Sequence, residues 1–273
     1  MLIVPQRLLP PAKFVYRANA AIFDGSSDYM ARDNDFLGAE ENDVLFSCWM
    51  YIPSFSLTGV KTLTGLGGWL DGDENERFGL LVNITPESAA ANSAFKISVL
   101  GDFCNDDFGG PGLSNHGWTT LYSYQRDTWY HLLYRVSNAG PHQFYINNQE
   151  ATVASAFNNA EYFSFYSDSP NNMTVGAVTS PGDKQTYQYF YGYIAEFWLD
   201  TSLLSPFDMS LAAKRRTFID PNNKPAYLGP HGNLPLGVNP KIYLNRLATQ
   251  FGVNAGTGGN FSISGSLLIA PSP

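Results

Sequence analysis

The sequence, 273 residues long, is poor in cysteine and in charge. Its two cysteines, Cys48 and Cys104, are too few for the disulfide framework of a small secreted domain. Cys48 lies in a strand-like run and is expected to be a small buried apolar residue, with a Cys48–Cys104 bridge as the alternative. Charged residues make up 15% of the chain and the net charge is −8, which argues against nucleic acid or anionic membranes as partners.

Long apolar runs are also missing. No stretch approaches the ~18 consecutive apolar residues that span a bilayer, so membrane insertion is not expected. The N-terminal segment has no basic leader and is interrupted by Pro5, Pro10 and Pro11. We therefore expect no secretory signal.

Aromatic residues and glycines are abundant: the chain has 16 Tyr, 19 Phe and 25 Gly. Aromatic residues favour half-buried pleated surfaces, and turn signals separate the apolar runs. The pattern predicts an all-β fold, a two-sheet antiparallel sandwich large enough to bury a core. The strand-like runs cover residues 20–30, 45–52, 77–84, 95–101, 120–124, 128–136, 142–148, 173–178 and 189–199.

Two of these runs show which residues face the core. In residues 45–52, apolar side chains occupy both alternating faces, which indicates a central strand covered on both sides. In residues 128–136, Tyr130, Leu132, Tyr134 and Val136 form the better core face. The opposite face carries Trp129, His131, Leu133 and Arg135.

The chain divides into three parts. Residues 1–20 are expected to form an extended arm and residues 21–220 the sandwich, including a helix over 206–218. Ser205 and Asp208 resemble a capping box around Pro206, and basic residues 214–216 suit the helix end. Residues 221–273 are expected to form a connector and C-terminal strands that pack on the sandwich or on a neighbouring subunit.

Residues 128–152 contain a Trp-Tyr-His strand followed by Phe-Tyr-Ile-Asn-Asn, and three other segments carry related motifs. These are Phe-Asp-Gly-Ser-Ser-Asp-Tyr-Met at 23–30, Phe-Ser-Cys-Trp-Met at 46–50 and Gly-Tyr-Ile-Ala-Glu-Phe at 192–197. Together they resemble the concanavalin A-like (laminin-G and pentraxin-like) sandwiches. The resemblance implies a jelly roll, in a family that includes lectins, adhesion modules, glycan-cleaving enzymes and virus-particle proteins. Asn148 replaces the family's turn glycine, and Ala195 replaces its aspartate.

The tail adds a narrower resemblance. Residues 240–244 and 256–261 are similar to C-terminal strands of virion-associated members in tailed bacteriophages. This similarity implies a virion protein assembled in the host cytoplasm. An intracellular role, or a chain already processed, would equally fit the lack of a recognisable signal.

Catalytic chemistry has little support. Glycan-cleaving members carry Glu-x-Asp-x-Glu on one strand face, whereas here Trp198 stands between Glu196 and Asp200. Four strand residues would separate those carboxyls by ~13 Å, beyond the ~5–9.5 Å that glycoside hydrolysis needs. One is expected to be a solvated strand residue and the other to start a loop. His131 is expected to be a packed strand residue, and the histidines show no metal-binding spacing. We expect no catalytic residues and no enzyme activity.

Two acidic loops are the candidate binding sites. Asp71, Asp73 and Asn75 offer oxygen ligands at alternate positions, so the expected cofactor is none or Ca²⁺, although the loop is not an EF-hand. Sugar binding uses exposed aromatic rings beside polar groups. The glycan-binding candidates are Trp69, Trp118, Asp106 and Asp107.

Three functional hypotheses follow. The first is a non-catalytic structural or decoration protein of a bacteriophage particle, in the capsid, fibre or tail. Its partners would be other virion proteins and further copies of the chain, contacted through the terminal segments. The second is a glycan-binding module for host-surface polysaccharide, which could coexist with the first. The third, a glycan hydrolase or lyase, is disfavoured by the missing carboxylate set.

Overall fold

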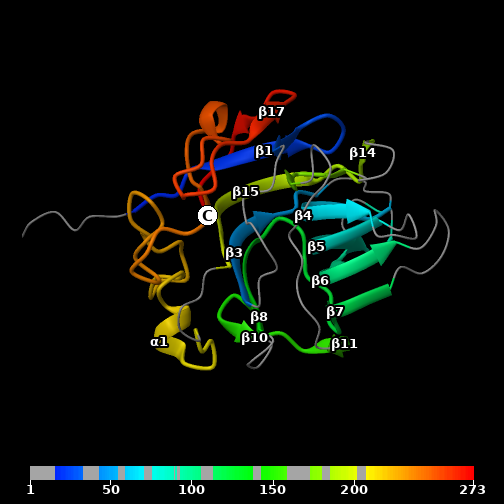
Figure 1. Cartoon of the computed structure of the whole chain (residues 1–273), viewed down its shortest axis with the longest axis horizontal. Helices are drawn as coiled ribbons and strands as arrows, with labels where there is room; N and C mark the ends of the chain where they lie inside the picture. Colours follow the sequence, from blue (N-terminus) through cyan, green and yellow to red (C-terminus); the bar gives the residue numbers. More distant parts are fainter. Residues whose placement is uncertain are drawn as a thin grey trace, which may run out of the picture.

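The structure is a computed structural model that describes residues 16–32, 43–54, 59–70, 76–88, 90, 93–105, 113–137, 143–158, 173–179, 185–201 and 207–273. Only the backbone is described for residues 43, 67–70, 76–79, 101–105, 113–117, 136–137 and 155–158. The described chain forms two large antiparallel sheets, one small sheet and short helical turns (Figure 1). The predicted all-β two-sheet sandwich is confirmed.

Sheet A contains eight strands in the order β10-β9-β8-β3-β15-β1-β18, with β16 beside β15. In chain order they are β1 (Ala20–Asp24), β3 (Asp43–Tyr51), β8 (Trp129–Ser137), β9 (Gln143–Ile146), β10 (Gln149–Glu150), β15 (Tyr191–Asp200), β16 (Ile242–Leu244) and β18 (Leu268–Ile269). Strand β3 lies centrally, between β8 and β15.

Sheet B also contains eight strands, in the order β11-β7-β6-β5-β4-β12-β2-β17. They are β2 (Tyr29–Arg32), β4 (Lys61–Leu70), β5 (Glu76–Pro86), β6 (Phe95–Asn105), β7 (Leu113–Thr120), β11 (Val153–Asn158), β12 (Met173–Val175) and β17 (Ser262–Ser264). Strands β13 (Val178–Thr179) and β14 (Thr186–Tyr187) form the small sheet.

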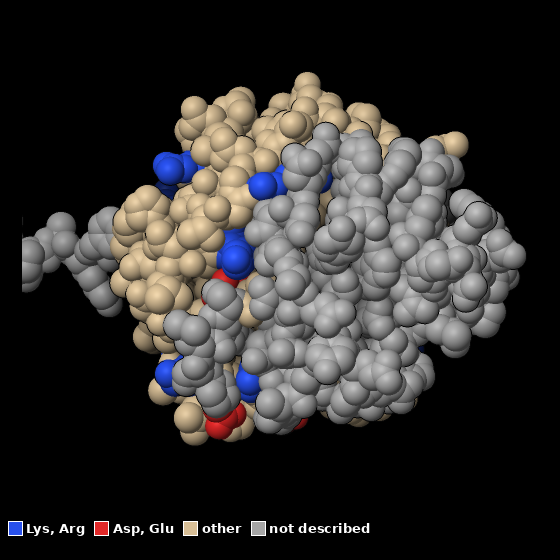
Figure 2. Space-filling model, viewed as in Figure 1, with Lys and Arg blue, Asp and Glu red and all other residues tan. Residues whose placement is uncertain are grey.

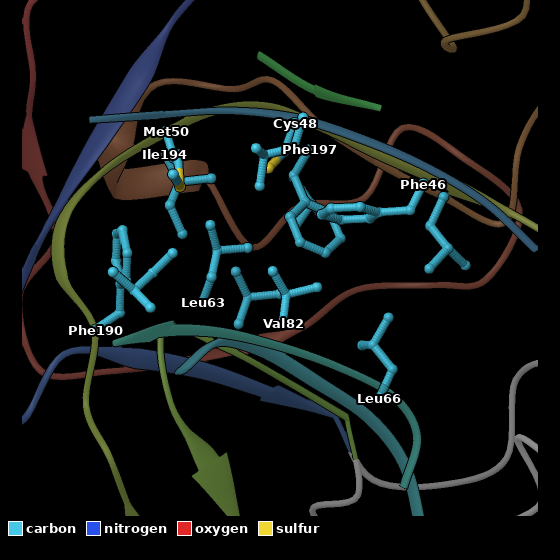
Figure 3. Packing of buried hydrophobic residues seen from close by; sticks show 14 of the residues in the cluster. Phe46, Cys48, Met50, Leu63, Leu66, Val82, Phe190, Ile194 and Phe197 are labelled. Atoms are coloured by element: carbon cyan, nitrogen blue, oxygen red, sulfur yellow. The ribbon is translucent and has the colours of Figure 1, made fainter. Parts of the chain in front are cut away.

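The main core fills the space between the two sheets. Phe46, Cys48 and Met50 point from β3 toward Leu63 and Val82 of sheet B (Figure 3). All five are fully buried, and each large apolar side chain contributes about 1.5–3 kcal/mol when buried. Cys48 carries a free thiol in this core, so the alternative Cys48–Cys104 bridge was wrong.

Alternate residues of strand β8 pack on opposite faces of sheet A, as the alternation of apolar residues in the sequence predicted. Tyr130, Leu132 and Tyr134 belong to the main core, whereas Leu133 packs on the other side of sheet A. The side chain of Val136 lies outside the described residues.

The outer face of sheet A is partly covered by the chain that follows β15. Trp198, Phe207 and Phe218 form a second buried cluster there, together with Leu45 of β3 and Leu133 of β8. In Figure 1 this later part of the chain, yellow to orange, lies on the side of β3 and β8 away from β4 to β7. Strand β3 is therefore buried on both faces, as predicted.

The helix is shorter than the sequence predicted. Helix α1 covers Ala212–Arg215, whereas the prediction ran over residues 206–218. Residues 202–206 lie outside the described residues, and with them the predicted cap. Phe207 and Met209 are buried in a non-helical segment, where Met209 N donates to Gln143 Oε1 (2.8 Å) and Ser210 N donates to Asp208 Oδ1 (2.8 Å). These contacts replace the first helical turn.

The C-terminal strands join both sheets. β16 pairs with β15, β17 with β2, and β18 with β1. At the other end, β1 begins at Ala20, and residues 1–15 of the expected arm lie outside the described residues. Within the part of the chain that the structure describes, no helix is long and apolar enough to cross a membrane.

Candidate functional site

The two acidic loops named from the sequence lie largely outside the described residues. These include Asp71, Asp73, Asn75, Asp106 and Asp107. Glu76 at the start of β5 pairs with Asn105 at the end of β6, so both loops leave the same end of sheet B. Trp69 pairs with Arg77 through its backbone, and its side chain is not described. The predictions for these residues remain predictions.

Trp118 lies in the core rather than on an exposed rim. Its side chain is 8% exposed and meets the Tyr134 ring edge-on, with the centroids 5.4 Å apart. A ring packed in this way offers no free face to a sugar. The expectation that Trp118 is an exposed stacking residue is therefore corrected by its burial.

Glu196 and Asp200 are both buried, so the expected solvated strand residue was wrong. Their exposed fractions are 2% and 0%. The pairing of β15 with β3 is irregular between Ala195 and Trp198, and Glu196 has a φ of +49° there. This bulge departs from the plain strand assumed from the sequence. Asp200 Oδ1 accepts a hydrogen bond from Lys241 N (3.3 Å).

Glu196 is held by two tyrosines from distant parts of the chain. Tyr16 OH donates to Oε1 (2.5 Å) and Tyr243 OH donates to Oε2 (2.6 Å). Burial raises the pKa of Glu196 to about 7, although both tyrosine hydrogen bonds act to lower it. The carboxyl ties Tyr16 and β16 to β15 and is sealed from solvent.

His131 is a packed strand residue, as predicted. It is 0% exposed, its Nε2 lies 2.8 Å from Ser47 Oγ, and its ring packs against Trp49 with centroids 5.1 Å apart. Burial lowers the pKa of His131 to about 3, so the ring is neutral. Its neighbour Trp49 lines a pocket on the outer face of sheet A.

That pocket has a volume of about 430 Å³. Five parts of the chain line it: β3, the turn into β8 with the first residue of that strand, the β9–β10 turn, residues 219–224, and residue 273. The lining residues are Trp49, Asp127, Thr128, Trp129, Asn147, Ile219, Asn223, Lys224 and Pro273. A pocket of this size is in the range of small-ligand sites.

Three of the polar lining residues adopt left-handed backbone conformations. The φ angles are +57° at Asp127, +49° at Asn147 and +56° at Asn223. Asp and Asn reach this region more easily than other non-glycine residues, because their short side chains bond locally. Each residue stands at a turn, so its side chain is placed by a fixed backbone geometry. Three turns thus converge on one pocket.

Asp127 is fixed from two sides. Ser54 N donates to Oδ1 (2.8 Å), the Ser54 hydroxyl donates to Oδ2, and Tyr51 OH donates to Oδ1 (3.2 Å). The side-chain and backbone hydrogen bonds of Ser54 hold the pKa of Asp127 below its usual value. The pocket therefore contains a carboxylate that is ionised at neutral pH.

The pocket also presents donors that the fold does not use. Asn147 Oδ1 accepts from His131 N (2.8 Å) and Asn223 Oδ1 accepts from Arg216 Nη1 (3.4 Å), but neither Nδ2 donates to a described protein group. Among the described residues, Lys224 Nζ and Trp129 Nε1 have no hydrogen-bond or ion-pair partner either. Asn147, Asn223 and Lys224 are exposed, so these groups are accessible to a polar ligand.

Charged side chains are scattered over the described part of the face that Figure 2 shows. On the face shown in Figure 2, the described Lys and Arg side chains lie apart from one another. The described residues contain no cluster of three or more His, Cys, Asp or Glu side chains placed to hold a metal ion. The pocket is thus the best-defined candidate site within the described chain.

Sequence reasoning missed this pocket, although a signal was available. Three of its lining residues favour turns: Asp127 directly precedes the predicted strand 128–136, Asn147 lies at the end of the run 142–148, and Asn223 lies in the predicted connector. Their convergence depends on which strands are neighbours and on how the chain after β15 folds back. A single sequence does not specify those contacts.

Comparisons with known proteins identify the fold. No family model and no curated protein sequence matches the chain. Its structure is similar to a heptameric SAP-like pentraxin from Limulus polyphemus, with a TM-score of 0.54 and 8% identity over 94% of this chain and 96% of that one. It is also similar to a candidate carbohydrate-binding protein from Bacteroides ovatus, with a TM-score of 0.54 and 12% identity. The match covers 94% of this chain and 60% of that protein's length. The chain has a concanavalin A-like jelly-roll fold.

Proposed function

We propose that the protein is a non-catalytic glycan-binding module whose site is the 430 Å³ pocket on sheet A. The observation that carries the proposal is the composition of the pocket. Trp129 supplies an aromatic side chain, and Asn147, Asn223 and Lys224 supply donors that the fold leaves unused. Sugars have this dual character, with an apolar ring face and a rim of hydroxyl groups.

The geometry favours recognition over cleavage. Glycoside hydrolysis needs two carboxyl groups in one site. Asp127 lines the pocket, whereas the two carboxyls considered from the sequence, Glu196 and Asp200, are buried and do not line it. The similar structures described above, a pentraxin and a candidate carbohydrate-binding protein, support a binding role.

Glycan-array binding tests the proposal, with the Trp129→Ala variant as the main probe. Loss of the Trp129 side chain should lower affinity about tenfold, because an aromatic contact worth about 1.4 kcal/mol is removed. Tyr122→Ala is the matched control, since Tyr122 is 66% exposed and does not line the pocket. Equal binding by both variants and the wild type would place any glycan site elsewhere.

The rim loops of sheet B are a second proposed location. Trp69, Asp106 and Asp107 would contact the sugar there, and Asp71, Asp73 and Asn75 would bind Ca²⁺. Parallel arrays with EDTA and with Trp69→Ala separate the two locations. Binding that survives both treatments but fails in Trp129→Ala would assign the site to the sheet A pocket.

A structural role in a bacteriophage particle is a second candidate function and is compatible with the first. It is supported by the sequence resemblance of the tail and by the edge strand β18, where Leu268 and Ile269 are 62% and 68% exposed. Exposed apolar residues on a sheet edge favour contact with another subunit. In this role the protein would sit in the virion beside other particle proteins and copies of itself.

Mass spectrometry of purified virions tests this second role, and recovery of peptides from this chain is the expected result. Light scattering of the wild type and of a Leu268→Lys, Ile269→Lys variant tests self-association. A monomeric wild type would remove the homo-oligomer from the proposal.

A further inference from the structure

An aromatic cluster adjoins the pocket on the outer face of sheet A. It consists of Trp129, Tyr51 and Tyr193, which stand opposite one another on the neighbouring strands β8, β3 and β15. The ring centroids are 5.6 Å apart for Tyr51–Trp129, 4.8 Å for Tyr51–Tyr193 and 6.2 Å for Trp129–Tyr193. All three side chains are half-buried, so each retains exposed surface.

The cluster and the pocket share structural elements. Trp129 belongs to both, and Tyr51 OH donates to Asp127 of the pocket wall (3.2 Å). The chain after β18 also runs past both, since Ala270 N donates to Ala20 O in β1 (3.0 Å) and Pro273 lines the pocket. The pocket and the cluster are therefore adjacent on the outer face of sheet A.

The rings of the cluster are not equivalent. Tyr51 and Tyr193 are stacked, with an angle of 5° between their planes, so each ring covers one face of the other. The Trp129 ring is inclined by 53° to Tyr51 and 55° to Tyr193. Among the described residues, the Tyr193 hydroxyl has no hydrogen-bond partner.

An apolar protein partner would leave these polar atoms unsatisfied, at a cost of about 1–3 kcal/mol for each buried group. A sugar residue can instead contact the ring edges and exchange hydrogen bonds with the Tyr193 hydroxyl and the free lone pairs of Tyr51. The pocket by itself has space for a small ligand, and the cluster extends it in one direction.

We propose that this aromatic cluster is a second subsite, so that the ligand is an oligosaccharide with one sugar in the pocket and the next on Tyr51 and Tyr193. The inference rests on the proposed glycan-binding function and specifies its ligand class as a chain of at least two sugar units. Trp129 lies between the two subsites and contacts both sugars.

Affinity measured against chain length tests this inference. Linear 1,4-linked oligomers of glucose, mannose and N-acetylglucosamine, from one to six units, serve as probes in calorimetry with the full-length protein. For the series that binds, we expect affinity to rise about tenfold between one and three units and then to level off. Tyr193→Ala should remove this rise and leave binding of the single sugar unchanged, whereas Trp129→Ala should weaken both.

Tyr193→Phe removes the hydroxyl and keeps the ring, so it separates the contributions of the two groups. We expect this variant to lose part of the increase in affinity with chain length and to keep the melting temperature of the wild type. Tyr122→Ala is the control and should match the wild type at every length. Affinity that is independent of chain length, or a Tyr193→Ala variant that weakens the monosaccharide equally, would overturn the second subsite alone. Absence of binding by glycans of any kind, on the array and in solution, would overturn the proposed function as well.

Discussion

Two carboxylates of this protein stand on left-handed backbone and accept hydrogen bonds from tyrosine, yet their environments are opposite. Asp127 has a φ of +57° and accepts from Tyr51, while Glu196 has a φ of +49° and accepts from Tyr16 and Tyr243. Asp127 is exposed at the pocket, whereas Glu196 is only 2% exposed. The pKa of Asp127 is lowered and that of Glu196 is raised to about 7.

The difference shows that tyrosine hydrogen bonds do not decide the charge of a carboxyl. Both tyrosines lower the pKa of Glu196, but burial disfavours the ionised form more strongly. At Asp127 the two hydrogen bonds from Ser54 act on a group that water still reaches. Asp127 is therefore suited to meet a ligand, and Glu196 to join distant segments of the fold.

The largest expected effect is on the pH dependence of stability at Glu196. Its folded pKa is above the unfolded value of 4.5, so the stability that it provides is complete below pH 4.5 and is lost as pH rises toward 7. A shift from 4.5 to about 7 corresponds to about 3 kcal/mol. Glu196→Gln cannot ionise, so its free energy of unfolding should lack this decline.

Chemical denaturation of the wild type and of Glu196→Gln from pH 4 to 8 measures the effect as the difference between their free energies of unfolding. The comparison with Glu196→Gln is needed because His131 changes the free energy of unfolding with pH in the opposite direction. Its pKa is lowered from 6.5 to about 3, so its contribution falls as pH drops below 6.5. Parallel pH profiles for wild type and Glu196→Gln would show that Glu196 titrates normally.

Tyr243→Phe should have the next largest effect. It removes the hydroxyl that donates to Glu196 Oε2 while keeping the buried ring. A hydrogen bond to a charged group contributes about 1.5–3 kcal/mol, so the loss should be about 2 kcal/mol at pH 8 and smaller at pH 5, where the carboxyl is protonated. Tyr122→Phe is the exposed control. A loss independent of pH would mean that Tyr243 acts by packing alone.

The sequence allowed the sandwich to be predicted because alternation reports which face of a strand is apolar. The core positions Phe46, Cys48, Leu132 and Tyr134 were all expected from this pattern and are all buried. Alternation failed at Glu196, because a bulge in β15 changes the face that each later residue occupies.

The candidate site was harder to predict, since its residues come from turns that are distant in sequence. Pairing of β3 with β8, and of β8 with β9, brings Trp49, Asp127 and Asn147 together. Lys224 reaches the same place only because the chain folds back over sheet A after β15. The sequence indicated polar turns at these positions but not which of them are neighbours.

The smallest effect on stability is expected for Asp127→Asn, where the comparison should be sharpest. Asn keeps the left-handed backbone accessible and can still accept from Ser54 N, and the site is solvated, so the cost should be below about 1 kcal/mol. The stability that the ionised carboxylate of Asp127 contributes should be present above the usual pKa of 3.8 and lost as pH falls. This pH dependence is opposite in sign to that of Glu196.

The glycan affinity of Asp127→Asn should nevertheless fall several-fold, because a carboxylate acceptor in the pocket is replaced by an amide. Denaturation and calorimetry on the same variant check both statements, and a variant that loses stability but keeps its affinity would reverse the roles assigned to the two carboxylates.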